Sequence, residues 1–418
     1  MKLKPYPAYK DSGVEWLDEI PNGWSVKPLK FISELRLSNI DKHTVEGDPA
    51  VLLCNYVDVY KNERIGLDIE FMSATASEEQ VKRLSLAVGD VIITKDSEDP
   101  RDIGIPAYVA EIRNDLVCGY HLALIRSNSN TSGEFLYWFL KSRYASASFE
   151  NEACGITRYA IGKYSIGNLD VSIPLPADQI SIANFLDRET GKLDSLISKQ
   201  EQLIDRFNER IIATVMGTLL STETQYIRLV HVCEVISRPV NQASENAFTR
   251  LGVLNRGRGL FKREETDSED MGDSDFFWVK NGDLVLSGQF AWEGSVAMAN
   301  DEHEGCVVSH RFPIIKGKAG IVLTEYLLAL FMTSHGDFLL NENSRGSAGR
   351  NRPLNMSLLL KEKIPIASMA IQNKVANLLR LQKKLKDKAS IQIDLLKEHR
   401  TALISATVTG KIDVREVA

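Results

Sequence analysis

Residues 179–220 read QISIANFLDRETGKLDSLISKQEQLIDRFNERIIATVMGTLL, and this stretch decides the fold. Apolar and small residues recur at alternating spacings of three and four, which is the pattern of a coiled-coil helix. The stripe consists of Ala183, Leu186, Thr190, Leu193, Ile197, Gln200, Ile204, Phe207, Ile211 and Thr214. A helix of roughly 40 residues is about 60 Å long, which exceeds the face of one globular domain. We therefore expect the stripe to pack on a partner helix.

A second stripe with the same spacing lies near the end of the chain. It consists of Val375, Leu378, Gln382, Leu385, Ala389, Gln392, Leu396, His399, Leu403 and Ala406. Two apolar stripes of equal length in one chain predict that the two helices pack on each other. The alternative is that each helix lies on its own domain. Periodicity does not distinguish a parallel pair from an antiparallel one.

The helices belong to a repeat that covers most of the chain. Val88–Thr94 (VGDVIIT) returns as Asn281–Ser287 (NGDLVLS), 193 residues later. At the same offset, Gln179 returns as Gln372, and Ala213-Thr-Val-x-Gly217 returns as Ala406-Thr-Val-x-Gly410. A repeat of this length is a duplicated domain plus helix, not a solenoid unit of about 20 to 50 residues.

The repeat divides the chain into four parts. These are a first lobe at 1–178, a first helix at 179–222, a second lobe at 223–365 and a second helix at 366–418. Short β-branched and apolar runs punctuated by Gly, Pro and Asp predict strands in both lobes. The predicted strands are Ala50–Tyr60, Asp90–Lys95, Ala107–Ile112, His121–Arg126, Asp283–Leu286, Ser295–Ala299 and Cys306–Ser309, and the predicted buried helices are Glu134–Ser142 and Glu325–Thr333. The expected fold class is α+β, with two homologous mixed lobes.

Composition sets limits on location and partners. No run approaches 18 consecutive apolar residues and the N-terminal residues lack an apolar signal core, so we expect a cytoplasmic protein that does not enter a membrane. Five widely spaced cysteines indicate reduced thiols rather than disulfides or a zinc site. The first lobe is acidic, with 19 basic and 26 acidic residues. Strong binding of nucleic acid requires neutralised phosphates, so acidic lobes argue against tight DNA binding by the chain alone.

Catalytic motifs are missing from the sequence. It contains no GxxxxGK[ST] phosphate loop, no HExxH motif and no GxSxG nucleophile elbow. The seven histidines lack metal-ligand spacing. We therefore expect a binding protein with no catalytic residue, no metal and no cofactor of its own.

Two loops at corresponding points of the repeat carry the best candidate binding residues. Arginine can contact guanine or phosphate with two hydrogen bonds, and asparagine suits adenine. The alternative is that both are solvated surface loops. The loop candidates are Thr157, Arg158, Tyr159 and Lys163 in the first lobe and Arg345, Arg350, Asn351 and Arg352 in the second.

Further candidates follow the predicted strands. Lys95 and Arg101 follow the first Gly-Asp strand and correspond loosely to Gln289 and Trp292 after the second. His121 and His310 occupy roughly equivalent positions in the repeat. Each histidine is either part of a polar contact surface or a partly buried residue at the end of a strand.

Three stretches resemble a known family. Tyr9-Lys-Asp-Ser-Gly-Val-Glu-Trp16 followed by Ile20-Pro-x-x-Trp24, Ile173-Pro-Leu-Pro-Ala-Asp-Gln179, and Leu396–Ser405 with Val408–Asp413 are similar to the opening, the domain–helix junction and the C-terminal helix of specificity subunits of type I restriction–modification enzymes. The second junction, Ile364-Pro-Ile-Ala367 before Gln372, lacks the second proline and the acidic residue. We therefore expect the second junction to be looser or differently angled.

The resemblance implies a function and partners. Two target-recognition domains would each read one half of a split sequence in double-stranded DNA, held apart by two antiparallel spacer helices. The helices would recruit two modification subunits that methylate adenine with S-adenosylmethionine. A restriction subunit that uses ATP and Mg²⁺ joins the complex in some systems. Partner subunits that clamp the duplex would also explain how a chain with acidic lobes reads DNA.

Two other functions remain open from the residues themselves. A duplicated adaptor would bind proteins with both lobes and use the coiled coil as a spacer. A nuclease would need a carboxylate–lysine site, for which Asp90 and Lys95 are the best candidates, but no Glu-x-Lys partner follows them.

Overall fold

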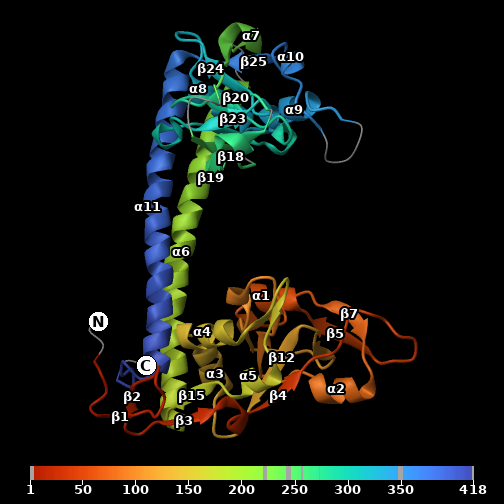
Figure 1. The fold of residues 1–418 in the computed structure, drawn as a ribbon, viewed down its shortest axis with the longest axis vertical. Coiled ribbons are helices and arrows are strands. Elements are labelled where there is room, and N and C mark those ends of the chain that lie inside the picture. Colours follow the sequence, from red (N-terminus) through yellow and green to blue (C-terminus); the bar gives the residue numbers. More distant parts are fainter. Residues whose placement is uncertain are drawn as a thin grey trace. The chain divides into compact units, whose positions relative to one another are not determined.

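The computed structural model describes residues 4–219, 224–241, 246–255, 258–272, 274–346 and 352–416. Contacts divide it into two compact units, Met1–Ser198 with Gln392–Ala418 and Lys199–Ile391 (Figure 1). Each unit contains one lobe and parts of two long helices, α6 (Pro176–Leu219) and α11 (Met369–Val408). The α+β class with two paired long helices is confirmed.

The first lobe is built on a five-stranded sheet. Its strand order is β4 (Ser33–Leu37), β12 (Leu122–Ser127), β8 (Val91–Thr94), β10 (Pro106–Val109) and β6 (Arg64–Ile65). Because side chains alternate across a strand, Val91 and Ile93 enter one core and Ile92 enters another. The first core holds α3 (Gly133–Leu140), α4 (Arg143–Glu152) and the start of α6.

Smaller elements complete this unit. A three-stranded sheet of β11 (Leu116–Cys118), β5 (Ala50–Cys54) and β7 (Met72–Thr75) covers the second core. The other elements are β1 (Tyr9–Asp11), β2 (Glu19–Pro21), β3 (Ser25–Pro28), η1 (Leu29–Phe31), α1 (Tyr56–Lys61), α2 (Glu78–Leu84), β9 (Asp96–Ser97), η2 (Pro100–Asp102), β13 (Cys154–Gly155), β14 (Tyr159–Ala160), α5 (Lys163–Gly167) and β15 (Asp170–Ile173).

The second lobe repeats the central sheet. Its order is β17 (Cys233–Ile236), β24 (Ile314–Gly317), β21 (Leu284–Leu286) and β22 (Val296–Met298), which matches β4, β12, β8 and β10. The second sheet has the order β19 (Leu260–Asp267), β18 (Ala247–Val253), β23 (Val307–Ser309) and β20 (Phe276–Trp278). The other elements are β16 (Gln225–Arg228), α7 (Leu229–Val232), η4 (Ser268–Met271), η5 (Ala291–Glu293), η6 (Asp301–His303), α8 (Thr324–Phe331), α9 (Ser334–Glu342), α10 (Met356–Leu359) and β25 (Lys363–Ile366).

The long helices follow the predicted stripes with one difference. On α6, Leu186 and Ile211 are fully buried, and Leu193, Ile197, Ile204 and Phe207 are half-buried. On α11, Leu378 is buried and Leu385, Leu396 and Leu403 are half-buried. The predicted positions Gln392 and His399 are wrong, because both are exposed and Ile393 and Arg400 occupy the sheltered face instead.

The helices lie side by side and run antiparallel within the first unit (Figure 1). Leu186 of α6 shares a core with Ile404 and Val408 of α11, and the later residue Asp194 contacts the earlier residue Arg400. The predicted second helix, 366–418, is longer than the observed one, which ends at Val408. Gly410, with φ of 77°, follows this end and adopts a conformation that stops helices.

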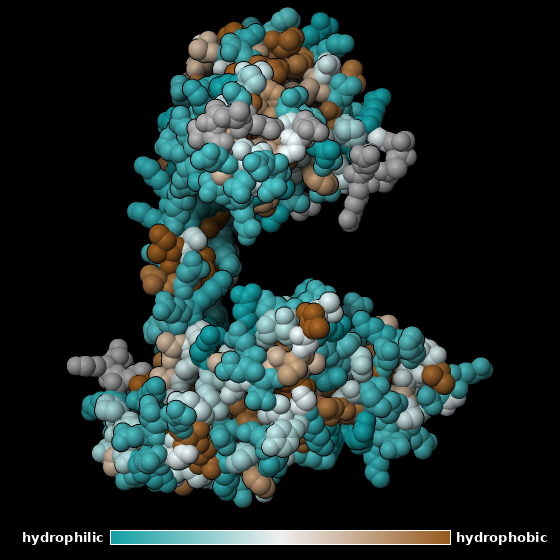
Figure 2. Space-filling view, viewed as in Figure 1, coloured by the Kyte–Doolittle hydropathy of each residue, from teal (hydrophilic) through white to brown (hydrophobic). Residues whose placement is uncertain are grey.

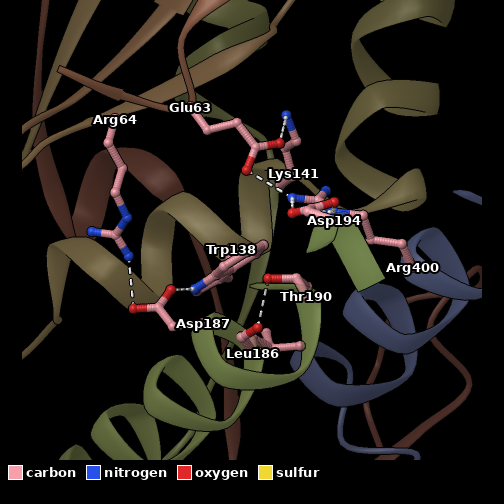
Figure 3. Close-up of polar contacts among 9 residues, drawn as sticks. All are labelled: Glu63, Arg64, Trp138, Lys141, Leu186, Asp187, Thr190, Asp194 and Arg400. Atoms are coloured by element: carbon pink, nitrogen blue, oxygen red, sulfur yellow. Dashed lines mark hydrogen bonds and ion pairs between the residues drawn. The ribbon is translucent and has the colours of Figure 1, made fainter. Parts of the chain in front are cut away.

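A polar network ties the first lobe to the helix pair (Figure 3). Glu63 binds Lys141 at 2.9 Å and Arg400 at 2.7 Å, and Arg400 reaches Asp194 at 3.0 Å. Asp187 accepts hydrogen bonds from Trp138 and Arg64. The Arg400 side chain is 13% exposed, so its burial depends on these two carboxylates.

One predicted strand is partly wrong. Ala50–Cys54 forms β5, but Tyr56–Lys61 forms the helix α1. Asn55 and Asp58 form a capping box that satisfies the first backbone N–H groups of this helix. The alternation of apolar and polar residues in Tyr56–Tyr60 led to the strand prediction, and the cap outweighs it.

The two lobe–helix junctions are equivalent. The Gln179 side chain accepts a hydrogen bond from the Ser132 backbone N–H and donates to the carbonyls of Asn130 and Pro174. Gln372 likewise accepts from Leu323 and donates to Ile321 and Ala367. These bonds do not support the expectation of a looser second junction, since all three are present despite the missing proline.

Candidate nucleic-acid interface

In each lobe the candidate loop forms a backbone hydrogen bond to the equivalent residue, which comes just after the Gly-Asp strand. In the first lobe this position is Lys95, whose N–H donates to the His121 carbonyl and whose carbonyl accepts from the Ile161 N–H. In the second lobe it is Gly288, which donates to Arg311 and accepts from Leu354. The repeat therefore brings the same three segments together in both lobes.

The turn before this position is also built identically. Gly89 and Gly282 adopt positive φ angles of 95° and 81°, which favour glycine. The next residue, Asp90 or Asp283, is buried and accepts a hydrogen bond from the backbone N–H of the residue three positions earlier.

An arginine pairs with each of these buried aspartates. Arg126 of β12 reaches Asp90 at 2.7 Å, and Arg238, which follows β17, reaches Asp283 at 2.6 Å. Asp90 therefore forms a structural ion pair with Arg126 and does not serve as the carboxylate of a nuclease site.

The candidate loop of the first lobe is a β-hairpin. Strand β14 pairs with β13 on one side and with β9 on the other. The turn holds Ile156, Thr157 and Arg158, and all three are exposed. Gly155 has a φ of 152°, and a Cβ there would lie 2.0 Å from the Arg158 carbonyl oxygen, so the turn requires glycine.

A buried carboxylate gathers the basic residues beside this hairpin. The Asp96 side chain is 8% exposed and contacts Arg158 at 2.7 Å, His121 at 2.7 Å and Lys95 at 3.6 Å. The Lys95 ammonium lies 4.9 Å from the centre of the Tyr120 ring. His121 adopts a φ of 68°, uncommon for a residue other than glycine, which turns its ring toward Asp96.

This cluster fixes positive charge at the surface. One carboxylate faces the ammonium of Lys95, the guanidinium of Arg158 and the ring of His121. The Arg158 side chain remains 52% exposed although it is oriented by Asp96. An oriented guanidinium with an exposed edge suits hydrogen bonding to a base or a phosphate.

The remaining candidates of the first lobe make other contacts or are exposed. Arg101 pairs with Asp99 at 2.6 Å, and its hydrogen bonds hold the pKa of Asp99 at about 2. Thr157 is exposed in the hairpin turn, and Tyr159 packs against the core. Lys163 begins α5 and lines the groove that β4 also lines.

The second lobe orients an arginine differently. Arg352 donates to the Ser344 carbonyl at 3.1 Å and to the Asn341 side chain, and its guanidinium lies 5.2 Å from the centre of the Trp292 ring. Arg345 binds Glu342 at 3.3 Å and is mostly exposed. Gln289 and His310 are exposed. The candidates Arg350 and Asn351 lie outside the described residues.

Sequence reasoning missed two residues of these sites, gave a third only a loose role and matched one histidine to a position that is one residue off. It did not identify Asp96, which organises the first cluster, or Ile156 at the hairpin tip, and it treated Trp292 only as a loose counterpart of Arg101. The shared hydrogen bonds match His121 with Arg311, so the neighbouring His310 is not its equivalent. Of the residues that sequence reasoning did name, Lys95, His121 and Arg158 meet around Asp96.

Among the described ranges, no group of three or more His, Cys, Asp or Glu side chains is placed to hold a metal ion. Within the same ranges, no helix has the length and apolar character needed to span a membrane.

Comparisons with known proteins agree on one type of relative. No family model matches the chain. The specificity subunit of the type I restriction enzyme StySPI from Salmonella potsdam is 19% identical over 363 residues, which cover 80% of this chain and 76% of that one.

Solved structures give the same result for the fold. A chain from a structural study of complex assembly and conformational transition of the type I restriction–modification system aligns with a TM-score of 0.62 and 16% identity, over 94% of this chain and 99% of that one. The type I S subunit from M. genitalium aligns over 92% and 96%, with 13% identity and a TM-score of 0.47.

Proposed function

We propose that this chain, which belongs to the specificity subunits of type I restriction–modification enzymes, reads a split sequence in double-stranded DNA with its two lobes. In this proposal, residues 1–178 and 223–365 are the target-recognition domains and 179–222 and 366–418 are the spacer helices. The observation that carries it is the shared backbone frame at Lys95 and Gly288, which presents a basic loop from each lobe.

The chemistry of the two loops supports the binding of one half-site by each lobe. We infer that Lys95, His121 and Arg158 contact bases or phosphates of one half-site, and that Arg345 and Arg352 do so at the other. The loop residues Thr157, Tyr159, Arg350 and Asn351, together with Arg101, Lys163, Gln289 and His310, complete the proposed contacts. Base contacts specify sequence and phosphate contacts set position, so each lobe needs both kinds.

The helices offer a surface for partner proteins. In the first unit Leu196 and Leu395 are 47% and 59% exposed, and in the second Leu381 and Ile391 are 52% and 63% exposed. Figure 2 shows hydrophobic surface on the helical part of the chain. We propose that two modification subunits bind there and carry S-adenosylmethionine, with ATP and Mg²⁺ confined to a restriction subunit where one is present.

Methylation mapping tests this function. The chain is co-expressed with modification subunits encoded beside it, and methylated adenines are mapped across the host genome. The expected result is one split motif with a fixed gap. Arg158→Gln should relax one half of the motif and Arg352→Gln the other. A stable complex that adds no methylation would favour the adaptor function and contradict this proposal.

A further inference from the structure

A basic groove on the first lobe lies beside the recognition hairpin. It encloses about 870 Å³ between β4, η1, α2 and α5. Its lining contains the cations Lys30, Arg36, Arg83 and Lys163 but only one carboxylate, Glu34. This local excess of three positive charges stands on a lobe whose acidic residues outnumber its basic ones by 7.

The groove cations are positioned mainly by neutral acceptors. Lys30 donates to the Asn168 side chain at 2.6 Å, and Arg83 donates to the Asn39 side chain at 2.8 Å. Arg36 is the exception: it donates to the Arg83 carbonyl and forms an ion pair with Glu34, which leaves the positive charge of the groove to the other three cations. Amide and carbonyl oxygens orient a cation without cancelling its charge, so the field of the groove remains positive.

Other cations of the same lobe contrast with these. Arg101 pairs with Asp99, and Arg113 lies 3.9 Å from Asp115. Each such pair is close to neutral as seen from a distance. The groove therefore differs from the surface around Arg101 and Arg113, where each cation is paired with a carboxylate.

The topology places one end of the groove beside the cluster that Asp96 forms with Lys95, His121 and Arg158. Strand β4 lines the groove and pairs antiparallel with β12. Leu37 lies opposite Ala123 at one end of this pairing, and Ser33 lies opposite Ser127 at the other. Strand β12 begins at Leu122, directly after His121. On the other wall, Lys163 follows the hairpin strand β14 by three residues. The groove thus extends along the sheet edge from His121.

We propose that Lys30, Arg36, Arg83 and Lys163 form a track for the phosphate backbone of the duplex whose bases the hairpin contacts. Duplex DNA carries one negative charge per about 1.7 Å of helix axis, so a groove with a net excess of three positive charges is complementary to it. Exposed Tyr164, 81% accessible in the same lining, supplies a hydroxyl donor for phosphate or sugar. The track sets position and carries no sequence information. This inference rests on the proposed DNA-reading function.

The test compares two variants of the chain, each bound to modification subunits. Both variants lose three positive charges, but at different places on the lobe. The groove variant is Lys30→Gln, Arg83→Gln and Lys163→Gln. The control variant is Lys10→Gln, Lys27→Gln and Arg113→Gln, which removes two lysines and one arginine exposed elsewhere on the lobe. Fluorescence anisotropy measures the binding of a duplex with the mapped target and of a scrambled duplex, from about 50 to about 200 mM salt.

The groove variant should weaken binding of both duplexes by the same factor, on the order of 10- to 100-fold at low salt, and should lower the slope of log affinity against log salt by about 2 to 3. The control variant should change neither. A groove variant that matches the control would overturn the phosphate track alone. An unmodified complex with no preference for the target duplex would instead overturn the DNA-reading function.

Folding and charge are separated by a second variant. Lys30→Arg with Lys163→Arg retains both charges and should keep the original salt slope. If it loses affinity as the groove variant does, shape rather than charge is responsible and the track is wrong. Thermal unfolding of every variant should match the unmodified chain, since the replaced side chains are exposed.

Discussion

The two lobes orient a candidate arginine beside the same backbone frame by different chemistry. Arg158 of the first lobe is fixed by the buried carboxylate of Asp96, whereas Arg352 of the second is fixed by neutral oxygens and the ring of Trp292. The backbone bonds beside them, at Lys95 and Gly288, are equivalent, although Arg158 precedes Ile161 by three residues and Arg352 precedes Leu354 by two. Duplication has therefore preserved the frame and changed the means of orienting the side chain.

Of the features that the two lobes share, the buried Asp–Arg pair before the loop should be the most sensitive to mutation. Replacing Asp90 or Asp283 by Asn leaves Arg126 or Arg238 without its buried partner, and each change should cost about 3 to 5 kcal/mol of unfolding free energy. Calorimetry should show the loss in a different transition for each variant. Asp99→Asn, at an exposed pair, serves as the control and should change little. Unequal losses would mean that the frames are not equivalent.

The orienting residues should separate the lobes. Asp96→Asn removes charge-assisted hydrogen bonds to Arg158 and His121 and should cost about 1.5 to 3 kcal/mol, with relaxed specificity at one half-site only. Trp292→Leu removes one cation–π contact and should cost about 0.5 to 1 kcal/mol, with the effect at the other half-site. Methylation mapping reads both. Relaxation of the same half-site by both variants would refute the assignment of one lobe to each half.

The junction glutamines should behave alike. Gln179→Ala and Gln372→Ala each remove three hydrogen bonds and leave buried backbone groups unpaired, so each should cost about 1 to 2 kcal/mol. Chemical denaturation of the two variants side by side measures this. A clearly smaller loss for Gln372→Ala would support the weaker second junction that its missing proline suggested.

The network at Glu63 has no counterpart of equal size among the described residues of the second lobe, where Arg380 lies 3.3 Å from Glu325. Burial raises the pKa of Glu63, but Lys141 and Arg400 outweigh it, and the pKa is lowered overall. A carboxyl with a lowered folded pKa stabilises the fold above its ordinary pKa, and this contribution disappears as the pH falls through the lowered value.

Glu63→Gln should therefore lower stability by up to about 1 kcal/mol at neutral pH, and the difference from the unmodified chain should close on acidification. Melting temperatures between neutral and acidic pH measure this difference. Glu325→Gln, which removes a contact to one exposed arginine, is the matched comparison and should have the smaller effect. A constant difference at all pH values would rule out titration of Glu63 as its cause.

The sequence predicted what depends on local pattern and repetition. The stripe on α6 is correct at each named position because coiled-coil spacing is local. On α11 the pattern misplaces Gln392 and His399, since Arg400 is sheltered by Glu63 and Asp194, which are distant in sequence. Lys95, His121 and Arg158 were identifiable by residue type. Asp96 was not, because an aspartate after a strand becomes an organising group only when the fold brings Lys95, His121 and Arg158 to it.

The half-buried middle of the helix pair has a consequence for amide exchange. Leu186 in the first unit and Ile211 in the second are fully buried, whereas Leu193, Ile197, Ile204 and Phe207 between them are only partly covered. Backbone amides exchange with deuterium through local opening, whose free energy rises with buried contacts. The isolated chain should therefore exchange slowly near Leu186 and Ile211 and faster at Ile197 and Ile204, and bound modification subunits should slow the faster group.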